Sequence, residues 1–189
     1  MPDTIERTRH RLRVDDYFRM GETGILGPEQ RTELIDGEIF DMAPIGQDHA
    51  SVVLRSNHGL MAAVGDRAMV SVQCPIRLGP YSAPEADFAL LRPRADFYGT
   101  GERPGPADIL LLIEVSDSSL RYDRDVKLPL YARAGIAEVW IVDINSRVIG
   151  AYREPRDGLY RVATMHSAGD AVAVGLAPEI TLRFDQILG

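Results

Sequence analysis

Ile-Leu-Leu-Leu-Ile-Glu-Val-Ser, residues 109–116, is the stretch that best defines the fold. A continuous apolar run of this length is typical of a central strand buried on both faces of a sheet. Glu114 interrupts the run, and a carboxylate in such a strand is costly unless it is paired or bound to a metal. The strand leads into a polar loop at 116–119, and ligand sites in open α/β sheets lie outside the carboxyl ends of strands. Glu114 is therefore a candidate functional residue, with a buried ion pair to an arginine as the alternative.

The segments after this strand predict a parallel strand–helix–strand unit. Residues 123–134 have the pattern of a helix that Gly135 closes at its C-cap, and residues 138–142 read as the next strand. A crossover of this kind should be right-handed. Asp36-Gly37, between two apolar stretches, is a strong hairpin signal. We expect further helices at 14–20, 47–64 and 185–188, and further strands at 32–35, 38–42, 68–73, 75–78, 85–91, 147–153 and 159–164.

These elements predict an α/β fold with a mixed parallel and antiparallel sheet flanked by helices. The 189 residues suit one domain, which we place at 13–189 after a flexible segment at 1–12. No apolar run reaches the roughly 20 residues of a membrane span, and the N-terminus lacks the apolar core of a signal peptide. The lone Cys74, expected in a buried strand, fits a reducing compartment. We therefore expect a cytoplasmic protein without a membrane partner.

Asp87 is the second candidate carboxylate. It precedes the apolar run 88–91 and would lie beside Glu114 if their two strands are neighbours. Two such carboxylates repel each other, and a divalent cation relieves the repulsion. Magnesium takes oxygen ligands and often uses only one or two carboxylates, with water and substrate phosphate completing its shell. The alternative for Asp87 alone is a turn or capping residue.

Lys127 is distinctive because it is the only lysine among 21 basic residues, the other 20 being arginine. Lysine is a compact charge whose pKa shifts readily, so a lone lysine can mark a place where arginine cannot serve, although chance explains it equally well. It stands about one turn into the helix that follows Glu114 and would reach back over the strand end. There it would stabilise a developing phosphorane charge or assist an attacking water. A solvated surface lysine is the alternative.

The remaining candidates have more than one interpretation from the residues alone. Glu33 and Glu38 flank the predicted turn, and one of them is expected to be a further metal ligand or an orienting residue. His49 opens a helix, where it would contact the metal or a phosphate, or cap the helix. Tyr131 shares the helix face of Lys127, where packing is favoured over catalysis. The arginines expected to contact neighbouring phosphates, or to form a solvated face, are Arg121, Arg124 and Arg133.

Several stretches resemble the Uma-two family of restriction endonucleases, which belongs to the PD-(D/E)XK nuclease superfamily. They are Glu-Leu-Ile-Asp-Gly-Glu (33–38), Pro-Glu-Ala-Asp-Phe-Ala (84–89), Ile-Glu-Val-Ser (113–116), Tyr-Asp-Arg-Asp-Val-Lys-Leu-Pro-Leu-Tyr-Ala-Arg-Ala-Gly-Ile (122–136) and Glu-Val-Trp-Ile-Val-Asp (138–143). The resemblance covers roughly residues 14–188, and its most specific block is 122–143.

The resemblance implies a restriction-endonuclease-like core in which Asp87 and Glu114 are metal ligands. The superfamily pattern places a lysine two residues after the glutamate, where this chain has a serine. The resemblance implies that Lys127 supplies the lysine from the next helix. It also implies that Glu38 is an additional catalytic acid, with Glu33 as its competitor for that role.

The sequence therefore predicts a DNA endonuclease, or related phosphodiesterase, that depends on Mg²⁺ or Mn²⁺. A net charge of −7 argues against broad charge-driven binding of nucleic acid, but metal-binding carboxylates count as negative until the cation arrives. The first alternative is a catalytically inactive nucleic-acid- or protein-binding module on the same fold. The second is a structural homodimer whose carboxylates form only internal ion pairs. A homodimer is a reasonable expectation for an active enzyme as well.

Overall fold

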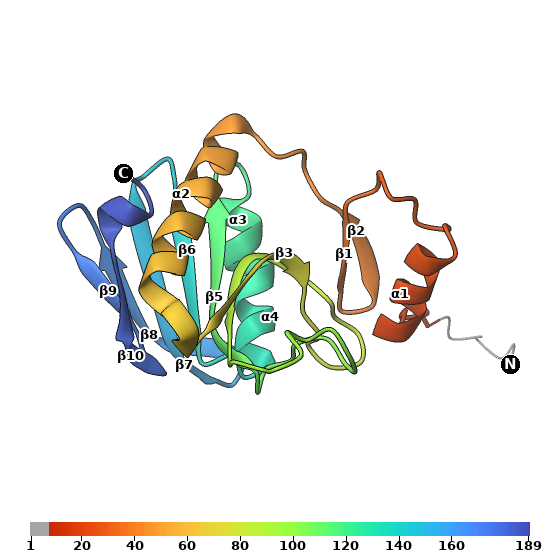
Figure 1. The fold of residues 1–189 in the computed structure, drawn as a ribbon. Helices are drawn as coiled ribbons and strands as arrows, with labels where there is room; N and C mark the ends of the chain where they lie inside the picture. Colours follow the sequence, from red (N-terminus) through yellow and green to blue (C-terminus); the bar gives the residue numbers. More distant parts are fainter. Residues whose placement is uncertain (1–7) are drawn as a thin grey trace, which may run out of the picture.

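The computed structural model describes residues 8–189 and is built around a six-stranded sheet of order β3-β4-β5-β6-β7-β8 (Figure 1). β5 and β6 are parallel, and the other neighbouring pairs are antiparallel. This confirms the mixed α/β sheet predicted from the sequence, and the parallel pair includes the 109–116 run. The strands are β3 (Met69–Pro75), β4 (Glu85–Leu91), β5 (Ile109–Ser116), β6 (Glu138–Asp143), β7 (Val148–Arg156) and β8 (Leu159–His166).

Helices cover both faces of this sheet (Figure 1). α2 (Gln47–Val64) lies on one face and ends in a short turn, η1 (Gly65–Arg67). A continuous helical segment lies on the other face, and it consists of α3 (Leu120–Tyr122), the π-helical turn η2 (Asp123–Lys127) and α4 (Leu128–Arg133). In the part of the chain that the structure describes, none of the helices combines the length and the apolar character needed to cross a membrane.

β5 contributes side chains to two separate apolar cores, which explains why its sequence is apolar throughout. Ile113 and Val115 belong to the core that α2 covers, whereas Leu112 belongs to the core that contains Tyr131 of α4. Because side chains alternate along a strand, Glu114 shares the face of Leu112 and points toward α4. β5 therefore places the Glu114 side chain between the sheet and the 120–133 helix.

The N-terminal elements form a small apolar cluster beside the sheet (Figure 1). They are α1 (Val14–Glu22), β1 (Thr32–Ile35) and β2 (Glu38–Asp41). Val14, Tyr17, Leu34 and Ala83 form the buried centre of the cluster. Leu34 and Ala83 also exchange backbone hydrogen bonds, with N···O distances of 3.4 and 2.7 Å. Since Ala83 lies two residues before β4, these bonds hold the β1–β2 hairpin next to the start of that strand.

The first part of the N-terminal segment predicted to be flexible, residues 1–7 of 1–12, lies outside the described residues. In the described part, the Leu12 N–H donates to the Gly37 carbonyl at 3.0 Å. Arg11 Nε donates to the Asp36 carbonyl at 2.8 Å. Residues 11 and 12 therefore lie against the turn of the β1–β2 hairpin.

The structure corrects three details of the sequence prediction. A C-terminal hairpin, β9 (Ala171–Val174) and β10 (Ala177–Arg183), was not predicted, and it packs against the core under α2. A single strand, β3, replaces the two predicted at 68–73 and 75–78. Cys74 is exposed, not buried, because β3 lies at the edge of the sheet. The predicted terminal turn at 185–188 corresponds to η3 (Phe184–Gln186).

Candidate active site

Asp87 and Glu114 face each other where β4 and β5 separate. The antiparallel register ends at the pair Phe88 and Ile113, and Asp87 and Glu114 are the next residues of the two strands. Beyond this point the Val115 N–H donates to Asp87 Oδ2 at 2.8 Å. The two predicted carboxylates are therefore cross-strand neighbours at the end of the sheet.

Asp87 is held by donors from three different elements. His49 Nε2, at the start of α2, lies 3.2 Å from each Asp87 carboxylate oxygen, and Gln73 Nε2 donates to Oδ1 at 3.2 Å. Burial opposes the ionisation of Asp87, but His49, Val115 and Gln73 outweigh it, so its pKa lies below the ordinary value. The hydrogen bond to Asp87 in turn raises the pKa of His49. The His49 Nδ1 atom is buried and has no partner among residues 8–189.

Lys127 lies among the acids, with a side chain only 5% exposed. Its Nζ donates to the Glu85 carbonyl at 3.0 Å and lies 3.3 Å from Glu33 Oε2 and 3.3 Å from Glu114 Oε1. The ammonium therefore hydrogen-bonds to the Glu85 carbonyl and to Glu114, and forms a further ion pair with Glu33. Burial opposes the charge on Lys127, but the carboxylates around it, Glu114 first, raise its pKa above the ordinary value. Lys127 is therefore a buried cation and not a solvated surface lysine.

A wide helical turn carries Lys127 to this position. In η2 the Leu128 N–H donates to the Asp123 carbonyl, five residues earlier. Pro129 follows, and in a regular α-helix its ring would crowd the carbonyl of Asp125. Single π-helical turns of this kind are frequent at functional sites. Asp123 and Lys127, at the two ends of the turn, are both buried.

Glu114 is bound by two side chains of the helix that covers it. It pairs with Lys127 and accepts a hydrogen bond from the Tyr131 hydroxyl. Burial raises the pKa of Glu114 well above the usual value, and the Lys127 ammonium acts in the opposite direction. Packing alone is thus an incomplete description of Tyr131. Asp123 lies nearby, accepts hydrogen bonds at 2.7 Å from the hydroxyls of Ser116 and Ser119, and also has a pKa raised by burial.

The structure places Glu33 in the site and leaves Glu38 outside it, which corrects the expectation that Glu38 was the additional acid. Glu33 pairs with Phe40 in the hairpin, whereas Glu38 pairs with Ile35, two residues closer to the turn. Two residues of strand amount to about 6 to 7 Å. Glu38 is accordingly 56% exposed and pairs with Arg9 at 3.3 Å. Glu33 is 4% exposed and contacts Lys127.

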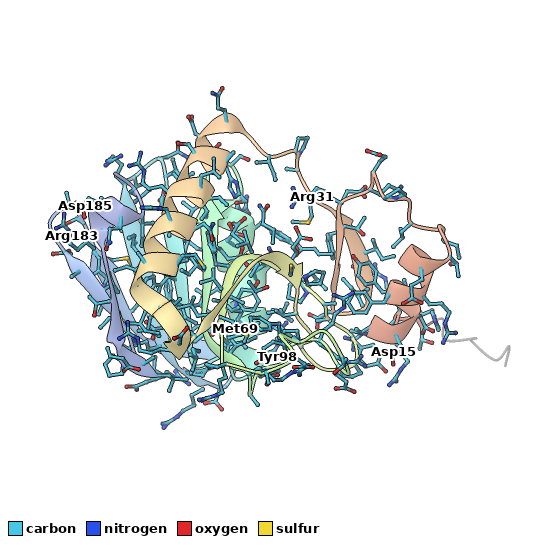
Figure 2. The ribbon with its side chains drawn as sticks, in the orientation of Figure 1. Asp15, Arg31, Met69, Tyr98, Arg183 and Asp185 are labelled. Atoms are coloured by element: carbon cyan, nitrogen blue, oxygen red, sulfur yellow. The ribbon has the colours of Figure 1, made fainter. Side chains whose placement is uncertain are left out.

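These side chains line a cavity of about 400 Å³ at the end of the sheet that faces the hairpin. Seven of its lining residues are aspartate or glutamate, whereas two are lysine or arginine. Arg31, at the start of the hairpin, is the second of these cations and bonds to Glu85 Oε1 at 2.6 Å (Figure 2). The loop after β2 adds an apolar wall at 42–45. The cavity is therefore acidic, with Lys127 as a buried cation inside it.

The three arginines expected to contact phosphates do not line this cavity. Arg121 is 95% exposed and lies 3.4 Å from Asp125 on its own helix. Arg133 forms an ion pair at 3.0 Å with Asp36 in the hairpin turn. Arg124 is exposed. That these arginines contact nucleic acid stays a prediction, and such contacts would lie on the outer surface of the 120–133 helix.

Sequence analysis missed several residues of the cavity. Asp123 had a usable signal, because it precedes Lys127 by four residues and Tyr131 by eight, which places all three on one helix face. Tyr122 donates its hydroxyl to Glu33 Oε1 at 3.0 Å, across 89 residues of sequence. Glu85 contributes a backbone carbonyl, which no side-chain pattern predicts.

The donor set fits a hard divalent cation that takes few protein ligands. Asp87 and Glu114 present carboxylate oxygens to one cavity from adjacent strands. Magnesium often binds through one or two carboxylates and fills its shell with water and substrate phosphate. Within residues 8–189, no three His, Cys, Asp or Glu side chains form a group that could hold a metal. A cation held here would therefore share Asp87 and Glu114 and take its other ligands from water or substrate.

The fold and the cavity define an α/β protein with an acidic, lysine-containing site at the end of a mixed sheet. Comparison with known families makes the class specific: the chain belongs to the Uma2 family, described as "Putative restriction endonuclease", which matches residues 14–185. This confirms the resemblance seen in the sequence. No curated protein matches the chain.

A solved structure supports the same fold. The chain is similar to the crystal structure of a "putative nuclease belonging to DUF820" from Anabaena variabilis ATCC 29413, with a TM-score of 0.70. The two share 15% sequence identity over 94% of this chain and 97% of that one. At this identity the likeness establishes the architecture of the sheet and helices and leaves the chemistry to the residues of the site.

Proposed function

We propose that this chain is a DNA endonuclease that depends on Mg²⁺ or Mn²⁺. The observation that carries the proposal is the position of Lys127, whose Nζ lies 3.3 Å from Glu114 in a cavity that Asp87 also lines. Three side chains from two strands and a helix thus line one cavity, and their charges are of the kind that phosphodiester hydrolysis requires. Membership in the Uma2 family supports a nucleic acid as the substrate.

In this proposal Asp87 and Glu114 would hold the cation. A bound divalent cation supplies Lewis-acid chemistry, because it polarises the scissile phosphate and lowers the pKa of a coordinated water. The lowered pKa of Asp87 keeps this carboxylate charged and available as a ligand. His49 acts as a positioning residue through its contact with both oxygens of Asp87.

Lys127 has the second role, at the phosphate. In hydrolysis the water oxygen attacks phosphorus and the bond to the leaving oxygen breaks, which yields a phosphate monoester and a hydroxyl. Positive charge placed where the phosphorane becomes more negative stabilises the transition state. Because the ammonium is already in contact with Glu85, Glu33 and Glu114, Lys127 would exchange one of these contacts for a phosphate oxygen. Glu33 is the acceptor we expect it to release, since Glu33 comes from the N-terminal hairpin and not from the central sheet.

Cleavage of supercoiled plasmid with Mg²⁺ or Mn²⁺ tests the proposal. We expect cleavage to stop in EDTA and to fall by at least about a hundredfold in Asp87→Asn and Glu114→Gln. Glu38→Gln is the matched control, because it removes one carboxylate outside the cavity and should leave the rate unchanged. Binding of Mn²⁺ can be monitored as the loss of the electron paramagnetic resonance signal of the free ion. It should weaken in Asp87→Asn and stay unchanged in Glu38→Gln. Undiminished cleavage by Asp87→Asn would reject the site.

The inactive binding module is the second candidate, and one observation favours it. Lys127 is already engaged by the Glu85 carbonyl, Glu33 and Glu114, and Ser116 stands where the superfamily pattern has its lysine. A module of this kind would retard DNA in a gel without binding Mn²⁺ and without cutting in any divalent cation. Mn²⁺ binding that depends on Asp87 would exclude it.

A further inference from the structure

The cavity has two walls of different chemistry. Glu33, Asp87, Glu114 and Lys127 form the charged wall, and the loop after β2 forms an apolar wall at 42–45. The ring of Phe40 also lines the cavity and packs against the ring of Tyr122, with centroids 6.2 Å apart and planes tilted by 51°. Phe40 is 36% exposed and Ile45 is 44% exposed, so this apolar surface is open to a ligand.

The charged wall lies deep inside the protein. The side chains of Lys127 and Glu114 are 5% and 4% exposed, so a phosphate must enter the cavity before it can approach the ammonium. The volume of about 400 Å³ is within the range of pockets that enclose a small molecule. A duplex keeps both bases of each pair stacked, so neither offers a free face to an aromatic side chain of the cavity. A nucleotide that has left the duplex can enter the cavity as a unit.

We propose that the cavity admits one unpaired nucleotide, so that the substrate is single-stranded or locally unpaired DNA. The base packs on Phe40 and the 42–45 loop, and its phosphate points toward Lys127. This inference rests on the proposed function, since it assigns a substrate class to the same site. Aromatic side chains bind unpaired bases of any sequence by stacking, because every base offers a π-face. The arrangement therefore selects for strand state and not for base sequence.

Charge supports the same substrate class. Proteins that bind duplex DNA through its backbone need a broad basic footprint, and this chain has a net charge of −7. Arg31, at the mouth of the cavity, is paired with Glu85 at 2.6 Å, and Arg121 and Arg133 are paired with acids outside it. Stacking of a base on an aromatic side chain adds binding energy that does not come from charge. A net charge of −7 therefore weighs against binding driven by the duplex backbone, while the apolar wall gives an unpaired base a contact of a different kind.

Binding and cleavage of three fluorescent DNAs test the inference. They carry the same sequence as a single strand, as a perfect duplex and as a duplex with a central unpaired loop. Binding is measured by anisotropy in Ca²⁺, and cleavage in Mn²⁺. We expect the single strand and the looped duplex to bind at least about tenfold more tightly than the perfect duplex. Cleavage should occur in the single strand and, in the looped duplex, within the unpaired loop.

Two variants connect the preference to the apolar wall. Phe40→Ala should weaken binding of the single strand about tenfold. Ile45→Glu should also weaken binding of the single strand, because it places a charge against the base. Ile45 lies in a loop outside the hairpin, so this variant still tests the inference if Phe40→Ala fails to fold. Phe97→Ala is the control, because Phe97 is 77% exposed and does not line the cavity.

The outcomes separate the two proposals. Equal binding and cleavage of duplex and single strand would overturn the inference and leave the nuclease intact. Tight binding of the single strand that depends on Phe40 and Ile45, without cleavage in Mn²⁺, would support the inference and reject the nuclease. Binding of single strand that is unchanged in both variants would also overturn the inference.

Discussion

Replacing Lys127 with methionine should destabilise the folded protein, because Lys127 pairs with two buried carboxylates. Methionine keeps an unbranched side chain but leaves Glu33 and Glu114, each 4% exposed, without their cation. Removing one partner of a buried ion pair costs about 3 to 5 kcal/mol, since the remaining charge stays desolvated. We therefore expect the free energy of unfolding to fall by about 3 to 5 kcal/mol at pH 8. Domains have a total of about 5 to 15 kcal/mol, so the variant should be only marginally stable.

The loss should depend on pH in a defined direction. Burial already raises the pKa of Glu114, and without Lys127 the folded-state pKa rises further above the ordinary 4.5. A carboxyl whose folded pKa exceeds its unfolded pKa keeps its proton in the folded state while the unfolded chain releases it. Stability then falls as the pH rises from the unfolded to the folded pKa. We expect the difference between wild type and Lys127→Met to be smaller at pH 5 than at pH 8.

Urea unfolding in EDTA, followed by the fluorescence of Trp140, measures this difference. Trp140 is the sole tryptophan and is fully buried, so its emission reports on the loss of the sheet core. Arg121→Met is the control, because it removes a cation of the same helix that is 95% exposed, and it should change the stability by less than about 1 kcal/mol. The reasoning is refuted if Lys127→Met loses less than about 1 kcal/mol at pH 8, or loses the same amount at both pH values.

Three further substitutions have expected outcomes. Tyr131→Phe removes the hydroxyl that donates to the buried glutamate of β5, so the free energy of unfolding in urea should fall by about 1.5 to 3 kcal/mol. Arg153→Met leaves the 2%-exposed Glu138 without its cation, so unfolding should be easier by about 3 to 5 kcal/mol and amide exchange in the 171–183 hairpin should accelerate. Glu38→Gln breaks a solvent-exposed pair and should change stability by less than about 1 kcal/mol, with metal-dependent cleavage unaltered.

Each of these expectations can fail separately. An unchanged midpoint in Tyr131→Phe would mean that the hydroxyl finds no charged acceptor in solution. Slow amide exchange in the 171–183 hairpin of Arg153→Met would mean that apolar packing alone holds the hairpin on the sheet. Loss of cleavage in Glu38→Gln would return this residue to the candidate site in place of Glu33.

The central part of the fold was predictable because its signals are local. The 109–116 run, the helical pattern at 123–134 and the strand at 138–142 specify a parallel crossover by residue type alone. The same geometry placed Lys127 over the end of β5, since a helix that returns across a sheet passes the strand it follows. Asp36-Gly37 defined the hairpin for the same reason: the turn needs backbone conformations that these two residues adopt easily, and both have positive φ, 49° and 84°.

The features that could not be predicted from the sequence depend on contacts between distant segments. The choice between Glu33 and Glu38 follows from the hairpin register and from the docking of Leu34 on Ala83, which the sequence does not encode locally. His49 meets Asp87 across 38 residues, only because α2 starts near the beginning of β4. The 171–183 hairpin has short strands, and its apolar side chains make sense only against the core under α2.

The electrostatics of the cavity give an independent reason to expect a cation there. Seven lining residues are acids and two are permanent cations, so the cavity carries more negative charge than its own basic residues offset. Lys127 neutralises part of Glu33 and Glu114, and His49 stabilises Asp87, yet Asp123 has serine hydroxyls as its hydrogen-bond partners. An uncompensated acidic cavity would repel the phosphate of any nucleic acid. Under the proposed function, a divalent cation held by Asp87 and Glu114 would remove that repulsion, so an acidic cavity is consistent with a metal-dependent nuclease.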